Sequence, residues 1–359
     1  MIGVTPPAHS STLLVIEGAI SPSFIADFAQ AHEAAGFDMV LIGYTSSSAE
    51  GFLVAMHAAA RTERLSYLVA HRPGFVAPTL FARKVATFDH LTGGRLALHV
   101  ITGKTDAEQE GDGDFTGKAE RYQRAQEYLH LLKRTWASDG PFDFEGRFYQ
   151  VRGAHSDVRP LQTPHPLIMF GGASDGALEM GAAECDVFAI YAEPRSTTAE
   201  RITDFRARAA RHGRQVGFNM SVRPIIATTE GAAWDKAKRI LDGMTGELGW
   251  ARHESEVRAP VDNAGRRQFA LAQEKDVHDE RLWMGITKAT GALGNTSSLV
   301  GTAEQVADSL LAYYRIGVTS FLIRGFDPVS DTIEFGRELI PRLKHGALEI
   351  DNEQPTDPG

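Results

Sequence analysis

The sequence predicts an α/β fold of the (β/α)8 TIM-barrel type, with insertions on the C-terminal face of the barrel. Short apolar or β-branched runs alternate with longer helical patterns along nearly the whole chain. Most of the short runs are continuously apolar, which is typical of strands buried on both faces of a parallel sheet. A doubly wound open sheet is the alternative. It is disfavoured because no glycine-rich dinucleotide fingerprint follows the first strand.

Short runs of apolar or β-branched residues mark the expected strands. They are Met39–Ile42, Ser66–Ala70, Leu96–Thr102, Leu167–Phe170, Asp186–Tyr191, Met220–Ala227 and Ser320–Ile323. One further strand is needed before Pro22 to complete a barrel of eight. Two segments compete for that position, Ile2–Thr5 and Leu13–Ile16.

The helical segments carry their own start and stop signals. Ser21 and Pro22 give a cap and a first-turn proline to a helix that should end at Gly36. Thr302 and Gln305 have the spacing of a capping box before another helical run. These signals predict helices between the strands, as the barrel requires.

We expect a single domain over residues 1–350, followed by a disordered acidic tail, Asp351–Gly359. Two stretches, residues 103–118 and 244–298, are longer than ordinary connections. Extensions that follow barrel strands lie on the C-terminal face, where chemistry takes place and long loops act as lids. The alternative is surface decoration or a dimer contact.

Composition excludes several classes of function. The chain has 359 residues with 37 Lys and Arg against 46 Asp and Glu, a formal charge of −9. We therefore expect no nucleic-acid partner, and any anion site must be a local cluster of cations. The single cysteine, Cys185, excludes a disulfide framework and a multi-thiolate metal site. No apolar run approaches the ~18 residues of a membrane span, and a cytoplasmic location is expected.

The segment between the strand Leu167–Phe170 and the next helical run is a candidate anion site. It consists of Gly171, Gly172, Ala173 and Ser174. Glycines let backbone N–H groups approach an anion, and a helix N-terminus adds partial positive charge. The alternative is an ordinary tight turn capped by Ser174 or Asp175, which is more common for so short a motif.

Three further residues lie where barrel enzymes place functional groups. His99 and Thr102 occupy the C-terminal half of a predicted strand, and Tyr122 follows at the start of a helix. His99 should face away from Leu98, because strand side chains alternate. Taken alone, His99 is more often a satisfied core histidine and Tyr122 a packed aromatic.

Cations near predicted strand ends are the other candidates. Arg72, Arg223 and Arg324 lie at or near such ends, and Lys288 lies in the long insertion. Guanidinium groups that converge would suit a tetrahedral oxyanion such as sulfonate or phosphate. The alternative is ordinary ion pairing.

The sequence lacks the motifs of two kinds of hydrolase, the metal-dependent and the serine enzymes. The chain has no His-x-His at the first strand, no HExxH and no CxxC, so no metal site and no metal-dependent barrel hydrolase is expected. The serines at positions 46–48 lack a GxSxG elbow, so a serine hydrolase is unsupported.

An ordered series of segments resembles the bacterial-luciferase-like superfamily of flavin-dependent monooxygenases. The chain is most similar to the FMNH2-dependent alkanesulfonate monooxygenase branch. The similarity runs from about Ile25 to Leu343. It is carried by Ala35–Gly43, Leu68–Gly103, Glu120–Tyr122, Phe142–Ala154, Pro166–Ala182 and Arg315–Phe326.

The resemblance implies a two-component enzyme that binds reduced FMN (FMNH2) supplied by a separate NAD(P)H-dependent FMN reductase. It also implies O2 as co-substrate, a homodimer or dimer of dimers, and cleavage of the C–S bond of an organosulfonate to sulfite and an aldehyde. Gly171 to Ser174 match the cradle of the flavin phosphate and ribityl chain. His99, Thr102 and Tyr122 match positions that line the flavin.

Several positions depart from the branch. Ser48 stands where the branch has a cysteine, and Tyr191 replaces a tryptophan. Ser221 and Arg223 stand at its Arg and His positions. Phe326 and Pro328 occupy its Tyr and His positions, Arg324 comes one strand step earlier, and Lys288 stands in for an arginine of a mobile loop.

This redistribution favours a bulkier or more polar organosulfonate, such as a sulfosugar, over a linear alkanesulfonate. On the resemblance, Arg223 and Arg324 would bind the sulfonate, with Ser48, Arg72, Ser221, Lys288 and Phe326 around the substrate. His99 and Tyr191 would manage protons.

Other functions remain open. A monooxygenase of the same superfamily could act on a sulfone, an amine or a heterocycle and would need no arginine pair. A deazaflavin-dependent oxidoreductase shares the barrel. A non-catalytic flavin-binding protein would bind FMN without consuming O2.

Overall fold

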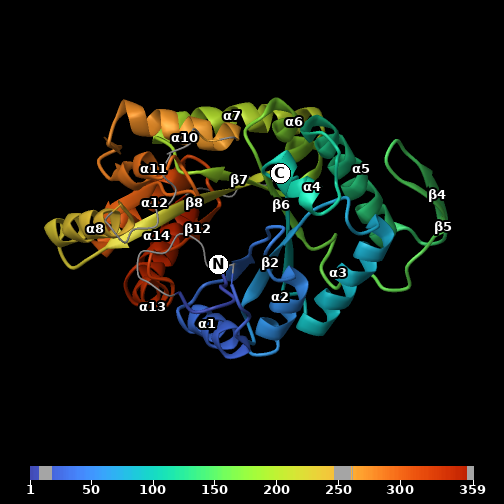
Figure 1. Ribbon diagram of the computed structural model, residues 1–359, viewed down its shortest axis with the longest axis horizontal. Helices are drawn as coiled ribbons and strands as arrows, with labels where there is room; N and C mark the ends of the chain where they lie inside the picture. Colours follow the sequence, from blue (N-terminus) through green and yellow to red (C-terminus); the bar gives the residue numbers. More distant parts are fainter. Residues whose placement is uncertain (8–17, 246–259, 261, 354–359) are drawn as a thin grey trace.

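The chain folds as a TIM barrel, as the sequence predicts, in the computed structural model of the protein (Figure 1). The structure describes residues 1–7, 18–245, 260 and 262–353. Parallel strands lie side by side in the order β1 (Met39–Ile42), β2 (Ser66–His71), β3 (Leu96–Val100), β6 (Leu167–Gly171), β7 (Val187–Tyr191), β8 (Gly217–Ile226) and β12 (Ser320–Ile323). Each predicted strand from Met39 onwards is therefore present, with small shifts at its ends.

The N-terminal residues take the remaining place in the ring. The N–H of Ile2 donates to the carbonyl of Leu41 in β1 at 2.9 Å, and the side chains of Ile2 and Val4 are buried. Of the two predicted segments, Ile2–Thr5 thus lies beside β1, although it forms no regular ladder. The competing segment Leu13–Ile16 lies outside the described residues.

Helices surround the strands (Figure 1). They are α1 (Pro22–Ala34), α2 (Gly51–Ala59), α3 (Pro78–Thr92), α5 (Lys118–Ala137), α6 (Asp175–Glu184), α7 (Arg195–Arg211), α12 (Ala303–Arg315), α13 (Pro328–Glu338) and α14 (Ile340–Glu353). The predicted caps are formed: Ser21 Oγ accepts the N–H of Phe24, and Thr302 and Gln305 make a full capping box. Local sequence signals therefore fix these helix ends.

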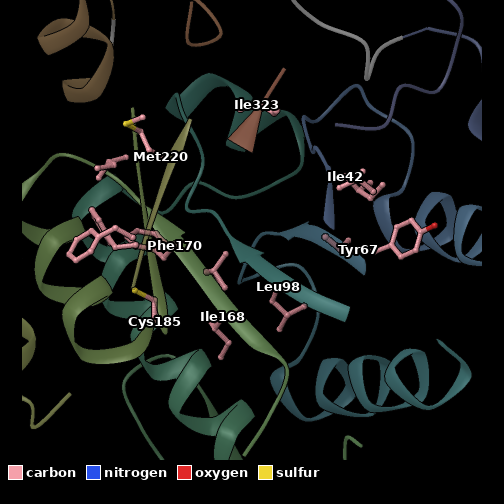
Figure 2. Packing of buried hydrophobic residues seen from close by; sticks show 14 of the residues in the cluster. Ile42, Tyr67, Leu98, Ile168, Phe170, Cys185, Met220 and Ile323 are labelled. Carbon is pink, nitrogen blue, oxygen red and sulfur yellow. The ribbon is translucent and has the colours of Figure 1, made fainter. Parts of the chain in front are cut away.

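Alternation along the strands separates an outer from an inner layer of side chains. Tyr67, Leu98 and Ile168 belong to the main buried cluster between strands and helices, part of which Figure 2 shows. Leu68 and Met169, one position away on the same strands, form a smaller cluster with residues on the barrel axis. Strands such as β2 and β8 are buried on both faces, which explains their long apolar runs.

The connections between barrel strands contain helices and strands that were not predicted from the sequence. β4 (Phe142–Glu145) and β5 (Gln150–Ala154) form a hairpin at the outer edge of the molecule (Figure 1). α4 (Asp106–Gly111) lies in the first insertion. Beyond α8 (Glu230–Thr245), the second insertion contains α10 (Asn263–Glu274), β9 (Val277–His278), β10 (Leu282–Trp283) and α11 (Gly285–Ala289).

Two ends differ from expectation. β11 (Ser298–Gly301) pairs in parallel with the second half of β8, so the second insertion ends in a strand. α14 continues to Glu353, three residues into the predicted disordered tail, because the helix stays packed through buried Ile350. The rest of that predicted tail, 354–359, lies outside the described residues.

Two negative findings apply to the described ranges. No helix there is both long and apolar enough to cross a membrane. No group of three or more His, Cys, Asp or Glu side chains in those ranges is arranged to hold a metal ion.

Buried histidines should make stability depend on pH. Burial lowers the pKa of His32 and of His71 to about 3, and that of His99 to about 4. Below about pH 6.5 these histidines become protonated in the unfolded chain, whereas in the folded chain they stay neutral. The contribution of the three buried histidines to the free energy of unfolding is therefore complete above pH 6.5. It declines as pH falls towards 4, by about 1.4 kcal/mol per pH unit for each histidine.

Urea unfolding between pH 7.5 and 4.5 tests this expectation. His71→Gln should flatten the pH dependence, whereas His345→Gln on the surface should leave it unchanged. His71 is packed on the Phe81 ring and hydrogen-bonded to the Tyr128 hydroxyl at 2.9 Å, so the variant should also be less stable at pH 7.5. Equal slopes for the wild type and the His71 variant would contradict the assignment.

Candidate active site

A cavity of about 460 Å³ opens at the C-terminal ends of the strands. Pairs of lining residues stand two positions apart on successive strands or just after them: His99 and Ile101, Met169 and Gly171, Ala189 and Tyr191, Asn219 and Ser221, Leu322 and Arg324. Alternate side chains of a strand face the same side, so these pairs are the inward face of the barrel wall. The predicted opposition of His99 and Leu98 is confirmed, because Leu98 packs in the outer cluster.

The four residues from Gly171 to Ser174 line one side of the cavity. Ser174 is the N-cap of α6: its Oγ accepts the N–H of Ala177 at 3.3 Å and donates to the Tyr122 hydroxyl at 3.2 Å. A side chain at Gly172 would place a Cβ 2.5 Å from the Cβ of Ala177. The segment is therefore the capped tight turn of the alternative reading, and it also presents the N-terminus of α6 to the cavity.

His99 and Thr102 both line the cavity, and Tyr122 lies beside Ser174. The His99 Nδ1 atom is buried and has no hydrogen-bond partner among the described residues. Burial lowers the pKa of His99 to about 4, so the imidazole is neutral at pH 7. The Thr102 carbonyl accepts from Nε of buried Arg121 at 2.8 Å, which secures the chain between β3 and α5.

Arg324 brings a guanidinium group to the opposite wall. One terminal nitrogen donates to the Gly294 carbonyl, and the Nε atom is buried without a partner among the described residues. Burial raises the pKa of the Tyr191 hydroxyl and nearby Asp262 raises it further, against the opposing effect of Arg324. Tyr191 is therefore a neutral donor beside a positive charge.

Arg223 does not line the main cavity. Its Nε donates to the Asn295 carbonyl at 3.0 Å, one terminal nitrogen donates to the Gly325 carbonyl at 2.8 Å, and its guanidinium lies 4.7 Å from the centre of the Phe326 ring. Phe326 is fully buried and also lies outside the cavity. Both arginines border a second cavity of about 30 Å³, so they lie at the same end of the barrel.

Three other residues that the sequence predicted around the substrate are either paired with other side chains or lie outside the cavity lining. Arg72 lines the cavity, but it is paired with Glu108 at 2.7 Å and with Asp112 at 3.1 Å. Ser48 donates to the Thr45 carbonyl of its own turn at 2.9 Å and lies outside the lining. Lys288 on α11 is half exposed, pairs with Asp276 at 3.1 Å, and is also outside the lining.

Several lining residues were not identified from the sequence: Lys104, Lys118, Glu193, Arg201, Asn219 and Asn295. Lys104, Lys118 and Asn295 belong to the two long connections, so insertion length was a usable signal for them. Arg201 and Glu193 form an ion pair at 3.0 Å, and Arg267 joins the same carboxylate at 2.8 Å. No local pattern indicates that pairing.

The sequence profile of the luciferase-like monooxygenase family matches residues 1–320. Solved structures share the fold. Riboflavin lyase (RcaE), solved with modified FMN and the substrate riboflavin, gives a TM-score of 0.73 at 19% identity, covering 90% of this chain and 85% of that chain.

Two further solved structures have similar scores. DmoA from Hyphomicrobium sulfonivorans gives a TM-score of 0.73 at 22% identity, covering 90% of this chain and 82% of that chain. EDTA monooxygenase (EmoA) from Chelativorans sp. BNC1 gives 0.71 at 20% identity, with coverages of 90% and 86%. At these identities the likeness establishes the fold.

The turn before α6 should not tolerate a methyl group at Gly172. Gly172→Ala places its Cβ against Ala177, so the helix start must shift, and we expect a loss of about 1–3 kcal/mol in the free energy of unfolding. Gly111→Ala at the end of α4 is the control, because no atom lies within 4 Å of its added Cβ. Urea unfolding at pH 7.5 measures both, and equal stability of the two variants would contradict this packing.

Proposed function

Because the chain belongs to the luciferase-like monooxygenase family, we propose that it uses reduced FMN and O2 to cleave the C–S bond of an organosulfonate. One observation carries this proposal. A single cavity has the α6 N-terminus with Gly171 to Ser174 on one side and the Arg324 guanidinium on the other; the buried Nε of Arg324 has no hydrogen-bond partner in the described part of the chain. The first side suits a phosphate and the second suits a sulfonate.

The residues present fit a flavin mononucleotide. Ser174 and the first backbone N–H groups of α6 would hold the phosphate, with Tyr122 fixing the Ser174 side chain. Apolar side chains of the inner wall, among them Leu41, Leu68 and Met169, offer a surface for a flat ring system. The His99 side chain lines the same space, and its buried Nδ1 has no hydrogen-bond partner among the described residues.

Reduced flavin, when bound, supplies the two electrons for oxygen activation. The net reaction converts the sulfonate, O2 and FMNH2 into an aldehyde, sulfite, water and FMN. Arg324 would bind the sulfonate through charge-assisted hydrogen bonds, and the neutral Tyr191 hydroxyl would donate a further one. His99, neutral at pH 7, can accept a proton at a ring nitrogen.

Reduced FMN would come from a separate NAD(P)H-dependent FMN reductase, and the working assembly would be a homodimer or a dimer of dimers. Both inferences follow from the resemblance to the two-component enzymes. In the same way, a polar sulfonate such as a sulfosugar is the preferred substrate class. It is consistent with the polar lining that Asn219, Ser221 and Asn295 add near Arg324.

The phosphate cradle predicts a specific loss of flavin affinity. Ser174→Ala removes the N-cap of α6 and the hydrogen bond to Tyr122, so the backbone N–H groups that would hold the phosphate are less firmly placed, and we expect FMNH2 to bind about tenfold more weakly. Ser48→Ala is the matched control, because that hydroxyl is used within its own turn. Anaerobic fluorescence titration measures both affinities. Equal affinities for the wild type and the Ser174 variant would argue against the cradle.

The sulfonate assignment predicts sulfite release. The enzyme would be loaded anaerobically with FMNH2, mixed with O2 and a panel of linear, aromatic and sugar sulfonates, and assayed for sulfite. Arg324→Met should raise KM for an active sulfonate at least tenfold and leave FMNH2 affinity unchanged, because the lost charge and the lost bond to the Gly294 carbonyl both lie on the side of the cavity away from the phosphate cradle. Lys288→Met should change neither.

The same assay separates the alternatives. Sulfite from none of the sulfonates would reject the proposal. Turnover of a neutral sulfone, amine or heterocycle would identify another monooxygenase of the family. FMN binding without substrate-dependent O2 consumption would indicate a flavin-binding protein, and preferential binding of a deazaflavin would indicate the deazaflavin class.

A further inference from the structure

The segment 291–298, between α11 and β11, forms part of the cavity wall through Ala292, Gly294 and Asn295. Its backbone is unusual, because φ is +61° at Ala292, +68° at Gly294 and +52° at Asn295. Residues other than glycine rarely adopt the left-handed region, although Asn does so more often than most. The surrounding structure must therefore hold this segment in place.

Two arginines, buried Arg223 and partly buried Arg324, hold it. Arg324, just after β12, donates to the Gly294 carbonyl, and Arg223 of β8 donates from Nε to the Asn295 carbonyl at 3.0 Å. The backbone N–H of Arg223 also donates to the Ser297 carbonyl at 3.0 Å. The wall segment is thus tied to two strands of the barrel through its own carbonyl groups.

This anchoring fixes the Asn295 side chain. Asn295 is buried, its Nδ2 donates to Ser221 Oγ at 2.7 Å, and its Oδ1 accepts from the Ser297 hydroxyl at 3.1 Å. The amide is therefore oriented with its NH2 group towards Ser221. Because a lone pair of Ser221 Oγ is occupied by that bond, the hydroxyl hydrogen must point elsewhere.

Ser221 is placed to use that hydrogen on a ligand. It lines the cavity, and in the described part of the chain its hydroxyl hydrogen has no acceptor. On β8 it is in register with Tyr191 of β7 and with Leu322 of β12, two positions before Arg324. Tyr191, Ser221 and Arg324 therefore present hydrogen-bond donors from three adjacent strands.

We propose that Asn295 is a positioning residue that directs the Ser221 hydroxyl towards the cavity, so that Ser221 donates to an oxygen of the substrate group bound by Arg324. The identity of that group as a sulfonate rests on the proposed function. The Ser221–Asn295 pair itself requires only a ligand with an acceptor oxygen. Such a subsite selects ligands that accept hydrogen bonds, because a buried donor left unpaired is costly.

A double-mutant cycle tests the pair by equilibrium binding. Isothermal titration under anaerobic conditions, with FMNH2 saturating, would measure the affinity for 6-deoxy-6-sulfoglucose, a sugar sulfonate, and for the neutral methyl sulfone of the same sugar. The variants are Ser221→Ala, Asn295→Gly and the combination of the two. Glycine at position 295 keeps the positive φ accessible, so the amide is removed without new backbone strain.

Each single variant should weaken binding about tenfold, and the double variant should bind like Ser221→Ala alone, because Asn295 acts through the hydroxyl. Ser221→Thr keeps the hydroxyl and should retain affinity within about threefold. FMNH2 affinity should stay within twofold of the wild type in all four variants. A merely structural role would lower flavin affinity as well.

Additive losses in the double variant, or no loss for Ser221→Ala, would overturn the inference. If the wild type binds the sulfone and not the sulfonate, the proposed sulfonate function fails while the cycle, run on the sulfone, still decides the role of the pair. Binding of neither probe to the wild type would overturn both.

Discussion

Parallel strands of the barrel end at one edge, and every second side chain of each strand faces the axis. The candidate site depends on that geometry. His99, Ala189 and Ser221 are far apart in sequence but line one cavity, because the side chain of each faces the barrel axis near the end of its strand. Their outward neighbours pack under the helices and anchor the wall. A shift of one residue in any strand would exchange the two sets and replace polar groups by apolar ones.

The arginines that line the cavity are stabilised in two different ways. Arg72 is neutralised by Glu108 and Asp112, so it contributes packing and an ion pair. Arg324, which is partly buried, instead donates to the Gly294 carbonyl, which satisfies a hydrogen bond without cancelling the charge. The positive potential at that end of the barrel is therefore retained, and burial strengthens its effect on any anion that enters.

Much of the fold was predictable because it is encoded locally. Continuous apolar runs identified the strands, and caps such as Ser21 identified helix ends. The strand starting at Leu96 ends at Val100 rather than Thr102, although the N–H of Ile101 still donates to the His71 carbonyl, and Ile101 and Thr102 both line the cavity. The β4–β5 hairpin was not predicted as strands. β5 is largely exposed and lacks the apolar run of a buried strand.

Cavity residues that lie at strand ends could be predicted from the sequence. Residues whose place depends on contacts with distant parts of the chain could not. Tyr191 and Arg324 lie at strand ends, and both line the cavity. Arg223 has the inward phase, yet it is covered by segment 291–298, which no local pattern places there. Asn295 is hydrogen-bonded to Ser221, a residue 74 positions earlier, so its contact could not be read from its neighbours.

The forked pairing of β8 has a consequence for how the molecule can change over evolution. The first half of the strand is held between β7 and β12, whereas the second half pairs with β11 at the end of the long insertion. A change in the number of residues between α8 and β11 therefore need not move the first half of β8, which carries Asn219 and is paired with β7 and β12. Parts of the insertion that do not anchor to the barrel as Gly294 and Asn295 do can therefore vary in length while β7, β8 and β12 keep their pairing.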